Sequence, residues 1–166
     1  MLGSPPLDQF DTKVVRVASD GRLLVDGRSD RRPLLVQTYA STVQLTGVQR
    51  VRHDVIFDLY RPNGTPRLRL LAAGRFPDAW LAPRGAITIW AKRPGRLTLV
   101  VTMPRGTQVT PVRFNDRVVQ VRPGKRMTLH FSVPGGGPWS LHFSSKKQGY
   151  LGDRAVSVLA PILHFH

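Results

Sequence analysis

Apolar and polar residues alternate along much of the second half of the chain, as they do in strands that bury one face. From Met127 to Val133 the odd-numbered positions are apolar and the even-numbered positions are polar. Trp139, Leu141 and Phe143 alternate with polar neighbours in the same way. A sheet that buries only one face needs a second layer over that face. The pattern therefore predicts two sheets packed face to face.

Glycine, proline and asparagine close a short β-prone run roughly every 8–12 residues, which is the strand spacing of an antiparallel sandwich or barrel. The chain contains 15 Gly and 14 Pro but no glutamate, a strong helix former, so the composition also disfavours helices. We expect an all-β fold, an antiparallel two-sheet sandwich of jelly-roll type. The expected strands are 13–17, 22–25, 34–45, 48–60, 67–70, 86–91, 97–102, 112–114, 118–121, 127–133, 139–144 and 156–159.

Turn signals define the expected ends of the strands in the first half. Asp20-Gly21 and Asp26-Gly27 are typical of hairpin turns. Thr46-Gly47 and the Pro-Asn-Gly segment at 62–64 are expected to separate long strands. Positions 51, 55, 57 and 59 are apolar, so this face of its strand is expected to enter the core. Pro161 is expected to end the last strand.

The length of 166 residues suits one domain. We expect residues 1–12 to be a lead-in segment, residues 13–160 a single β-sandwich domain, and residues 161–166 a C-terminal tail. The longest apolar run, Leu70–Ala73, is too short to cross a bilayer. The first residues lack a basic region followed by a hydrophobic stretch, so no signal peptide is predicted.

The charge of the chain is strongly positive. It has 25 Lys and Arg against 10 acidic residues, a net charge of +15, and 20 of the 25 basic residues are Arg. Such a charge attracts nucleic acid, anionic lipid and phosphorylated polymers. The arginines are spread over the whole length, as on solvated strand faces. Two interpretations stay open: a general surface charge, or one functional side that faces an anion.

The residue types offer little catalytic chemistry. The absence of cysteine excludes a disulfide framework and a thiol nucleophile. No nucleophile elbow or phosphate-binding loop is present in the sequence. Gly135–Gly137 is expected to form a hairpin loop whose strands place His130 and His142 on one outer face, where solvent-facing histidines are commoner than metal ligands. We therefore expect no metal and no cofactor, and we do not predict an enzyme.

The loop between Gly74 and Pro83 carries the most informative residues, because Trp80 lies outside any alternation. An aromatic ring can stack on the apolar face of a sugar, while carboxylate and guanidinium groups bind its hydroxyl groups and anionic substituents. In the alternative interpretation, Phe76 and Trp80 turn inward and cap the sandwich. Trp90 and Trp139 are expected in the core. The candidate carbohydrate-binding residues are Arg75, Asp78, Trp80, Arg84, Tyr150 and Asp153.

Parts of the second half of the chain resemble one known domain. The similar segments are 76–80, 85–90, 95–101, 123–124, 138–141 and 151–158. They resemble the C-terminal extracytoplasmic β-sandwich, a carbohydrate-binding-like domain, of actinobacterial multi-spanning membrane glycosyltransferases. Its most specific pieces are the Pro-Asp-x-Trp loop and the Gly-Asp-Arg-x-Val-Ser-Val segment, and that family more usually has Gly where this chain has Ala79. The resemblance implies a jelly-roll-like domain without transferase chemistry that holds or orients a cell-envelope glycan acceptor.

We therefore expect a non-catalytic module that binds an anionic cell-envelope carbohydrate, as an accessory to a membrane glycosyltransferase. It is expected on the extracytoplasmic face of the membrane as a soluble domain of a larger membrane protein, or in the cytoplasm if it stands alone. Two alternatives stay open: a nucleic-acid-associated basic β protein, and a structural or assembly subunit. An anionic membrane surface and a membrane-embedded catalytic domain are further candidate partners, and nucleic acid is less favoured.

Overall fold

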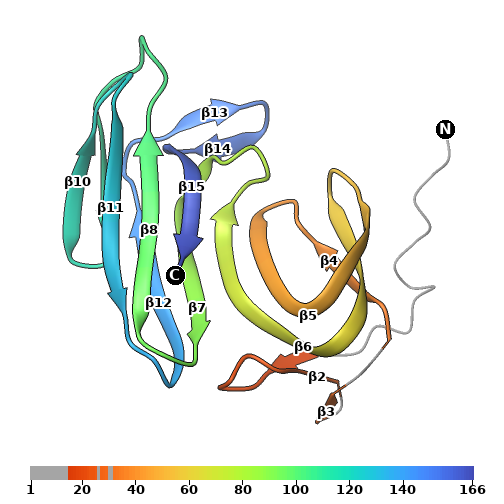
Figure 1. The fold of residues 1–166 in the computed structure, drawn as a ribbon. Coiled ribbons are helices and arrows are strands. Elements are labelled where there is room, and N and C mark those ends of the chain that lie inside the picture. The colour runs from red at the N-terminus through yellow and green to blue at the C-terminus, as the bar shows by residue number, and fades with distance from the viewer. Residues whose placement is uncertain (1–14, 26, 30–31) are drawn as a thin grey trace, which may run out of the picture.

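The computed structural model describes residues 15–25, 27–29 and 32–166, which form strands and no helix (Figure 1). The named strands pair antiparallel throughout. The prediction of an all-β antiparallel fold is confirmed, whereas the jelly-roll connectivity stays a prediction. The expected lead-in at 1–12 and Asp26 of the second Asp-Gly turn lie outside the described residues.

Two sheets form the body of the molecule. The larger has the strand order β10-β9-β12-β7-β6-β4, with β5 also paired to β6, and the smaller has the order β11-β8-β15. The strands of the larger sheet are β4 (Leu34–Gln37), β5 (Ser41–His53), β6 (Phe57–Arg75), β7 (Leu81–Ala91), β9 (Thr110–Phe114), β10 (Arg117–Val121) and β12 (Gly137–Ser144). Those of the smaller sheet are β8 (Gly95–Thr102), β11 (Arg126–Val133) and β15 (Leu159–Phe165).

Two small hairpin sheets flank this body. The first contains β1 (Val15–Val17), β2 (Leu23–Val25) and β3 (Arg28–Ser29), and the second contains β13 (Gly149–Leu151) and β14 (Arg154–Val156). The turn at Asp20-Gly21 joins β1 to β2, as predicted, with the N–H of Gly21 donating to the Ala18 carbonyl at 2.8 Å.

The core lies between the two main sheets and is built from the apolar phase of their strands. Leu97, Leu99 and Val101 of β8 are fully buried and face Ile87 and Ile89 of β7 in the same cluster. Each fully buried aliphatic side chain of this kind contributes about 1.5–3 kcal/mol relative to an exposed one. The buried apolar residues of β7, β8 and β12 therefore hold the two sheets together.

Strand β6 is long and bent, and its first half leaves the sandwich. Its last residues pair with β7 on one side and with the first residues of β5 on the other. Its first residues pair with β4 and with the last residues of β5 in a curved projection that we call the arm (β4, β5 and residues 57–65; Figure 1). Residues 34–65 are all described, and none of their apolar side chains is fully buried. The prediction that the apolar face starting at Val51 enters the core is wrong: Val51 is 44% and Val55 77% exposed, because the arm has no second sheet over it.

Two predicted turns lie inside continuous strands. Gly47 falls in the middle of β5, and Pro62, Asn63 and Gly64 fall in β6. The two segments oppose each other across a bulge, where the register shifts between Thr46 and Val48 and Gly47 has a φ of 70°. Such a bulge accommodates a left-handed glycine and a proline without ending the pairing. Pairing between β5 and β6 thus overrides the local turn signal.

The glycine-rich segment after β11 is not a hairpin loop, as the sequence predicted. Strand β11 pairs with β8 and strand β12 pairs with β7, so the segment crosses from one sheet to the other. His130 and His142 are exposed on different sheets rather than side by side.

The last strand continues beyond its expected end. Strand β15 passes through Pro161 at a register shift and ends at Phe165, so it includes most of the residues that we expected to be a tail. Within the described ranges, no helix is long and apolar enough to span a bilayer.

Candidate functional site

The Phe76–Trp80 loop closes one end of the sandwich. The N–H of Phe76 donates to the Trp80 carbonyl at 2.9 Å, and the N–H of Ala79 donates to the Phe76 carbonyl at 3.0 Å. Ala79 has a φ of 69°, a left-handed conformation that favours glycine. The side chain of Phe76 is buried. The loop is therefore a tight turn whose first aromatic points inward.

Trp80 lies partly buried against the core and forms an isolated bridge to Leu159 of β15. Trp80 therefore closes the end of the sandwich, and part of its ring stays at the surface. Its predicted stacking on a sugar stays a prediction.

The polar residues of the predicted site are held by internal partners. The carboxylate of Asp78 accepts a hydrogen bond from Arg154 at 2.7 Å, and this contact lowers the pKa of Asp78 below its usual value. The guanidinium of Arg154 also lies over the ring of Phe76, 4.8 Å from its centroid. Arg75 donates to the Ala160 carbonyl at 2.9 Å and to the Thr42 hydroxyl at 2.7 Å, and burial lowers its pKa.

The other candidates lie at the surface. Tyr150 is 67% exposed on β13, and Asp153 is exposed in the turn before β14. Arg84 is exposed on β7, opposite Ser144 of β12. The structure therefore brings the Asp78 loop and the β13–β14 hairpin together through Arg154, and it fixes Arg75 inside the protein.

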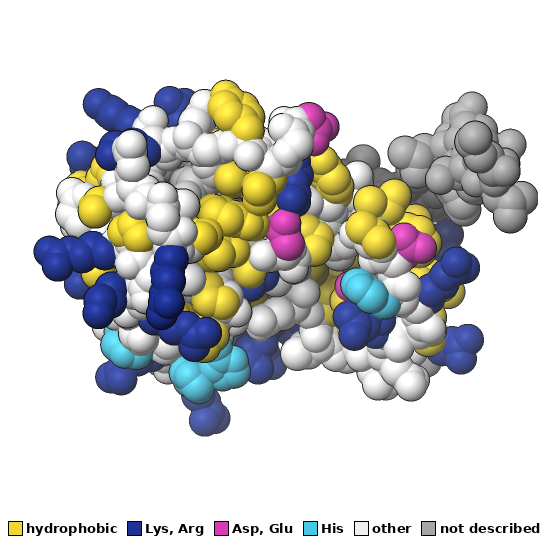
Figure 2. All heavy atoms as spheres, turned by 90° about the horizontal axis from the view of Figure 1, so that it is seen from above, with side chains coloured by type: hydrophobic (Ala, Val, Ile, Leu, Met, Phe, Trp, Pro, Cys, Tyr) yellow, Lys and Arg dark blue, Asp and Glu magenta, His cyan; other side chains and the backbone are white. Residues whose placement is uncertain are grey.

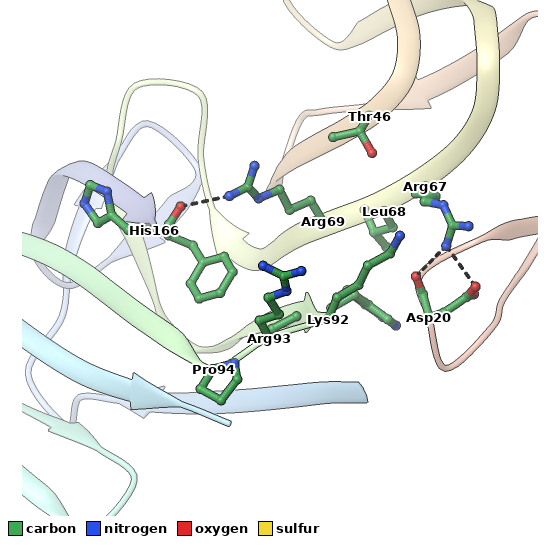
Figure 3. A pocket seen from close by; sticks show the side chains of 12 residues that line it. Asp20, Thr46, Arg67, Leu68, Arg69, Lys92, Arg93, Pro94 and His166 are labelled. Atoms are coloured by element: carbon green, nitrogen blue, oxygen red, sulfur yellow. Dashed lines mark hydrogen bonds and ion pairs between the residues drawn. The ribbon is translucent and has the colours of Figure 1, made fainter. Parts of the chain in front are cut away.

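A second site lies at the opposite end of β7 and is lined in part by basic side chains (Figure 3). It is a pocket of about 490 Å³ between β6, the β7–β8 turn and the end of β15. The volume falls within the range of about 300–1,000 Å³ that is usual for small-molecule sites. The pocket is lined by Asp20, Thr46, Arg67, Leu68, Arg69, Trp90, Ala91, Lys92, Arg93, Pro94, Phe165 and His166.

Four basic side chains line this basic pocket, Arg67, Arg69, Lys92 and Arg93, and Asp20 is the one acidic side chain among the lining residues. Arg67 binds Asp20 at 2.8 Å, and this hydrogen bond, with contacts from Arg22, lowers the pKa of Asp20 to about 2. Arg69 donates to the Phe165 carbonyl at 3.3 Å and lies over the Phe165 ring. Lys92 and Arg93 extend from the β7–β8 turn toward β6 (Figure 3).

Lys92 and Arg93 have no hydrogen-bond or ion-pair partner among the residues that the structure describes. Like charges that converge without a counter-charge repel one another, and an anion placed between them removes this repulsion. Guanidinium and ammonium groups are the usual protein donors to carboxylate and phosphate oxygens. The arrangement therefore suits an anionic ligand.

Trp90 forms part of one wall of this pocket. The prediction that Trp90 lies in the core is wrong, because Ile87, Ile89 and Ala91 occupy the inward phase of β7 and Trp90 takes the outer one. The turn at Gly21 packs against it. Trp139, also expected in the core, packs against it and stays partly buried.

The basic pocket could not be found from the sequence. Arg67, Arg69, Lys92 and Arg93 are unremarkable members of an arginine-rich chain, and Asp20 and His166 come from its two ends. The available signals were the basic turn before Pro94 and the alternating arginines of β6. Nothing in the sequence links the two.

The described residues include no cluster of three or more histidine, cysteine or acidic side chains able to hold a metal ion. Comparison with protein-family models, with curated proteins and with solved structures found no match.

Proposed function

We propose that the protein is a non-catalytic module that binds an anionic carbohydrate of the cell envelope, as an accessory to a membrane glycosyltransferase on the extracytoplasmic face. The observation that carries the proposal is the basic pocket, in which Lys92 and Arg93 face the cavity without a charge partner among the described residues. Trp90 beside them offers an aromatic surface for a sugar ring.

The choice of a glycan rather than another anion rests on two further features. A β-sandwich with an open pocket at one end suits a binding module, and the sequence resembles the carbohydrate-binding-like domain of membrane glycosyltransferases. The left-handed φ of Ala79 supports this resemblance, since that family more usually has glycine at the position.

The proposal is tested by calorimetric titration with an oligogalacturonate, a uronic-acid polymer, and with a neutral galactose oligosaccharide of equal length. We expect the uronate to bind at least about tenfold more tightly, because each charge-assisted hydrogen bond contributes about 1.5 kcal/mol or more. The double variant Lys92→Gln/Arg93→Gln is expected to lose this preference.

The matched control is Arg113→Gln/Arg117→Gln, which removes two exposed cations from the β9–β10 hairpin. Equal weakening by both double variants would mean that net charge alone attracts the ligand, and the site assignment would be wrong. Tighter binding of single-stranded DNA than of the uronate, with a steep loss of affinity in salt, would favour the nucleic-acid alternative.

A further inference from the structure

The turn between β5 and β6 carries two exposed aliphatic side chains. Val55 is 77% exposed, the largest value among its large hydrophobic side chains, and Ile56 beside it is 45% exposed. Both residues lie at the outer end of the arm, away from the core of the sandwich (Figure 1). Val55 therefore contributes little to the packing of this molecule, and Ile56 leaves nearly half of its surface in solvent.

The turn is held in one shape by polar contacts below its tip. The carboxylate of Asp54 accepts the N–H of Val55 at 2.7 Å, and the N–H of Asp54 donates to the Phe57 carbonyl at 2.8 Å. The N–H of Thr38 donates to the Ile56 carbonyl at 2.9 Å. The backbone of the tip is thus supported from both sides, and its aliphatic side chains project from a fixed base.

Two arginines of β5 lie below this tip, and its carboxylates accept contacts from other groups of the protein. Arg50 and Arg52 are exposed on β5, and the guanidinium of Arg52 lies 5.9 Å from the centroid of the Phe57 ring. Asp58 is buried and binds His53 at 2.7 Å, with Arg50 at 3.8 Å. The tip therefore presents two aliphatic side chains, and Arg50 and Arg52 are exposed on the strand below them.

A second apolar projection lies at the same end of the molecule. Tyr150 and Leu151 of β13 are 67% and 39% exposed, and Lys146 and Lys147 precede them. Viewed from this end, hydrophobic side chains reach the surface on both the sandwich and the arm, and Lys and Arg side chains lie mainly around the edge (Figure 2). Acidic side chains also reach the surface in this view (Figure 2); Asp54, in the turn after β5, and Asp78, in the loop after β6, bind protein donors.

We propose that this end of the protein binds the surface of an anionic lipid bilayer, with Val55 and Ile56 inserted among the headgroups and Tyr150 at the interface. Charge complementarity decides for lipid, because exposed cations flank both apolar projections: Arg50 and Arg52 lie below the tip of the arm, and Lys146 and Lys147 precede Tyr150. Aliphatic and aromatic side chains on one side and Lys or Arg around them are the combination that binds anionic membrane surfaces. Separate projections suit a soft planar surface, whereas a protein partner needs a continuous complementary patch.

The chain contains no cysteine, so a single cysteine can report on the tip alone. Val55→Cys is labelled with the environment-sensitive dye NBD and mixed with vesicles of phosphatidylcholine and phosphatidylglycerol in equal parts. The matched control is Val118→Cys on edge strand β10, whose native side chain is 50% exposed. We expect the dye at position 55 to brighten and to be quenched by spin-labelled lipid, and the dye at position 118 to do neither.

Vesicle flotation of unlabelled variants measures the contribution of each group. Val55→Ser/Ile56→Ser should weaken binding by at least about tenfold, since buried methylene groups supply the insertion energy. Arg52→Gln should weaken it by about fivefold on the anionic vesicles, and pure phosphatidylcholine should bind far less protein. Val118→Ser should bind as the unchanged chain does.

Three outcomes would overturn the proposal. The first is that the fluorescence of the dye at position 55 stays unchanged when the labelled protein is mixed with the anionic vesicles. The second is equal brightening at both labelled positions, which would indicate nonspecific adsorption. The third is self-association in sedimentation that Val55→Ser/Ile56→Ser abolishes while vesicle binding is unaffected, which would assign the tip to contact between copies. None of these outcomes bears on the basic pocket, whose variants are separate.

Discussion

Asp78 and Arg154 are 76 residues apart in the sequence, and their carboxylate and guanidinium groups meet at 2.7 Å. The contact ties the loop after β6 to strand β14 at the end of the sandwich. A carboxylate that looked available for a sugar hydroxyl is thus the anchor of its own loop. The same guanidinium lies over the ring of Phe76, so Arg154 contacts both the carboxylate and the aromatic ring of that loop.

This ion pair predicts a dependence of stability on pH. The pKa of Asp78 is lower in the folded protein than in the unfolded chain, first because of Arg154. The stabilisation is therefore complete above the unfolded value of about 3.9 and is lost as the pH falls through the folded-state pKa. We expect Asp78→Asn to lower the melting temperature at neutral pH, and this difference to shrink in acid below about pH 4. Asp116→Asn, at the exposed β9–β10 turn, is the control and should show no such trend.

Replacement of Trp80 by Ala should destabilise the protein. The ring packs against the core but is only partly buried, so we expect a loss of about 2–4 kcal/mol, at or below the cost for a fully buried aromatic. Urea unfolding measures the change. Uronate titration of the folded variant then tests separately the prediction that Trp80 stacks on a sugar: unchanged affinity would contradict that prediction, and lost affinity with unchanged stability would contradict the structural role.

Gly21→Ala should detach the β1–β2 hairpin from β6. Gly21 has a φ of 83°, its carbonyl accepts the N–H of Leu68 at 2.7 Å, and an added Cβ would collide with the Leu68 carbonyl. The left-handed conformation alone costs about 1–2 kcal/mol for alanine. We expect faster hydrogen exchange at the Leu68 amide. Gly106→Ala shares the left-handed φ but has open space around it, so it should leave that amide unchanged.

Asp58→Ala should loosen the arm without unfolding the sandwich. Asp58 is 7% exposed and accepts hydrogen bonds from His53 and from the hydroxyl of Tyr60. The bond with His53 joins β6 to β5. Loss of these contacts should cost about 1–3 kcal/mol. We expect faster amide exchange in β4 and β5, with little change at Leu99 in the core. Equal acceleration in both regions would show that the arm and the sandwich unfold as one unit.

Local patterns were a good guide along β8 and β12 of the sandwich. The alternation of Leu97, Leu99 and Val101, or of Leu141 and Phe143, matches their burial, because a side-chain period of two places every second residue in the core. The same reasoning failed at Val51 and Val55, since alternation cannot show whether a second layer exists. The turn signal at Gly47 failed because pairing along the whole of β5 and β6 tolerates a bulge there.

For the candidate sites too, the sequence identified single residues but not their contacts in the fold. The sequence singled out Asp78, Trp80 and Tyr150, and it identified the positive charge that an anion would meet, but it could not show that Arg75 and Asp78 are occupied by partners far along the chain. It also could not assemble the basic pocket from Asp20, Arg67, Arg93 and His166.

By itself, then, the sequence determined the all-β class, most strands of the sandwich and the excess of arginine, because these depend on residue type and on a period of two along the chain. The tertiary structure alone decided which strands share a sheet, that β11 and β12 lie in different sheets, and where cations converge without a partner. The physical reason is that pairing, burial and electrostatic repulsion act between residues that are distant in sequence. Their outcome depends on how the chain returns to itself, which no local pattern records.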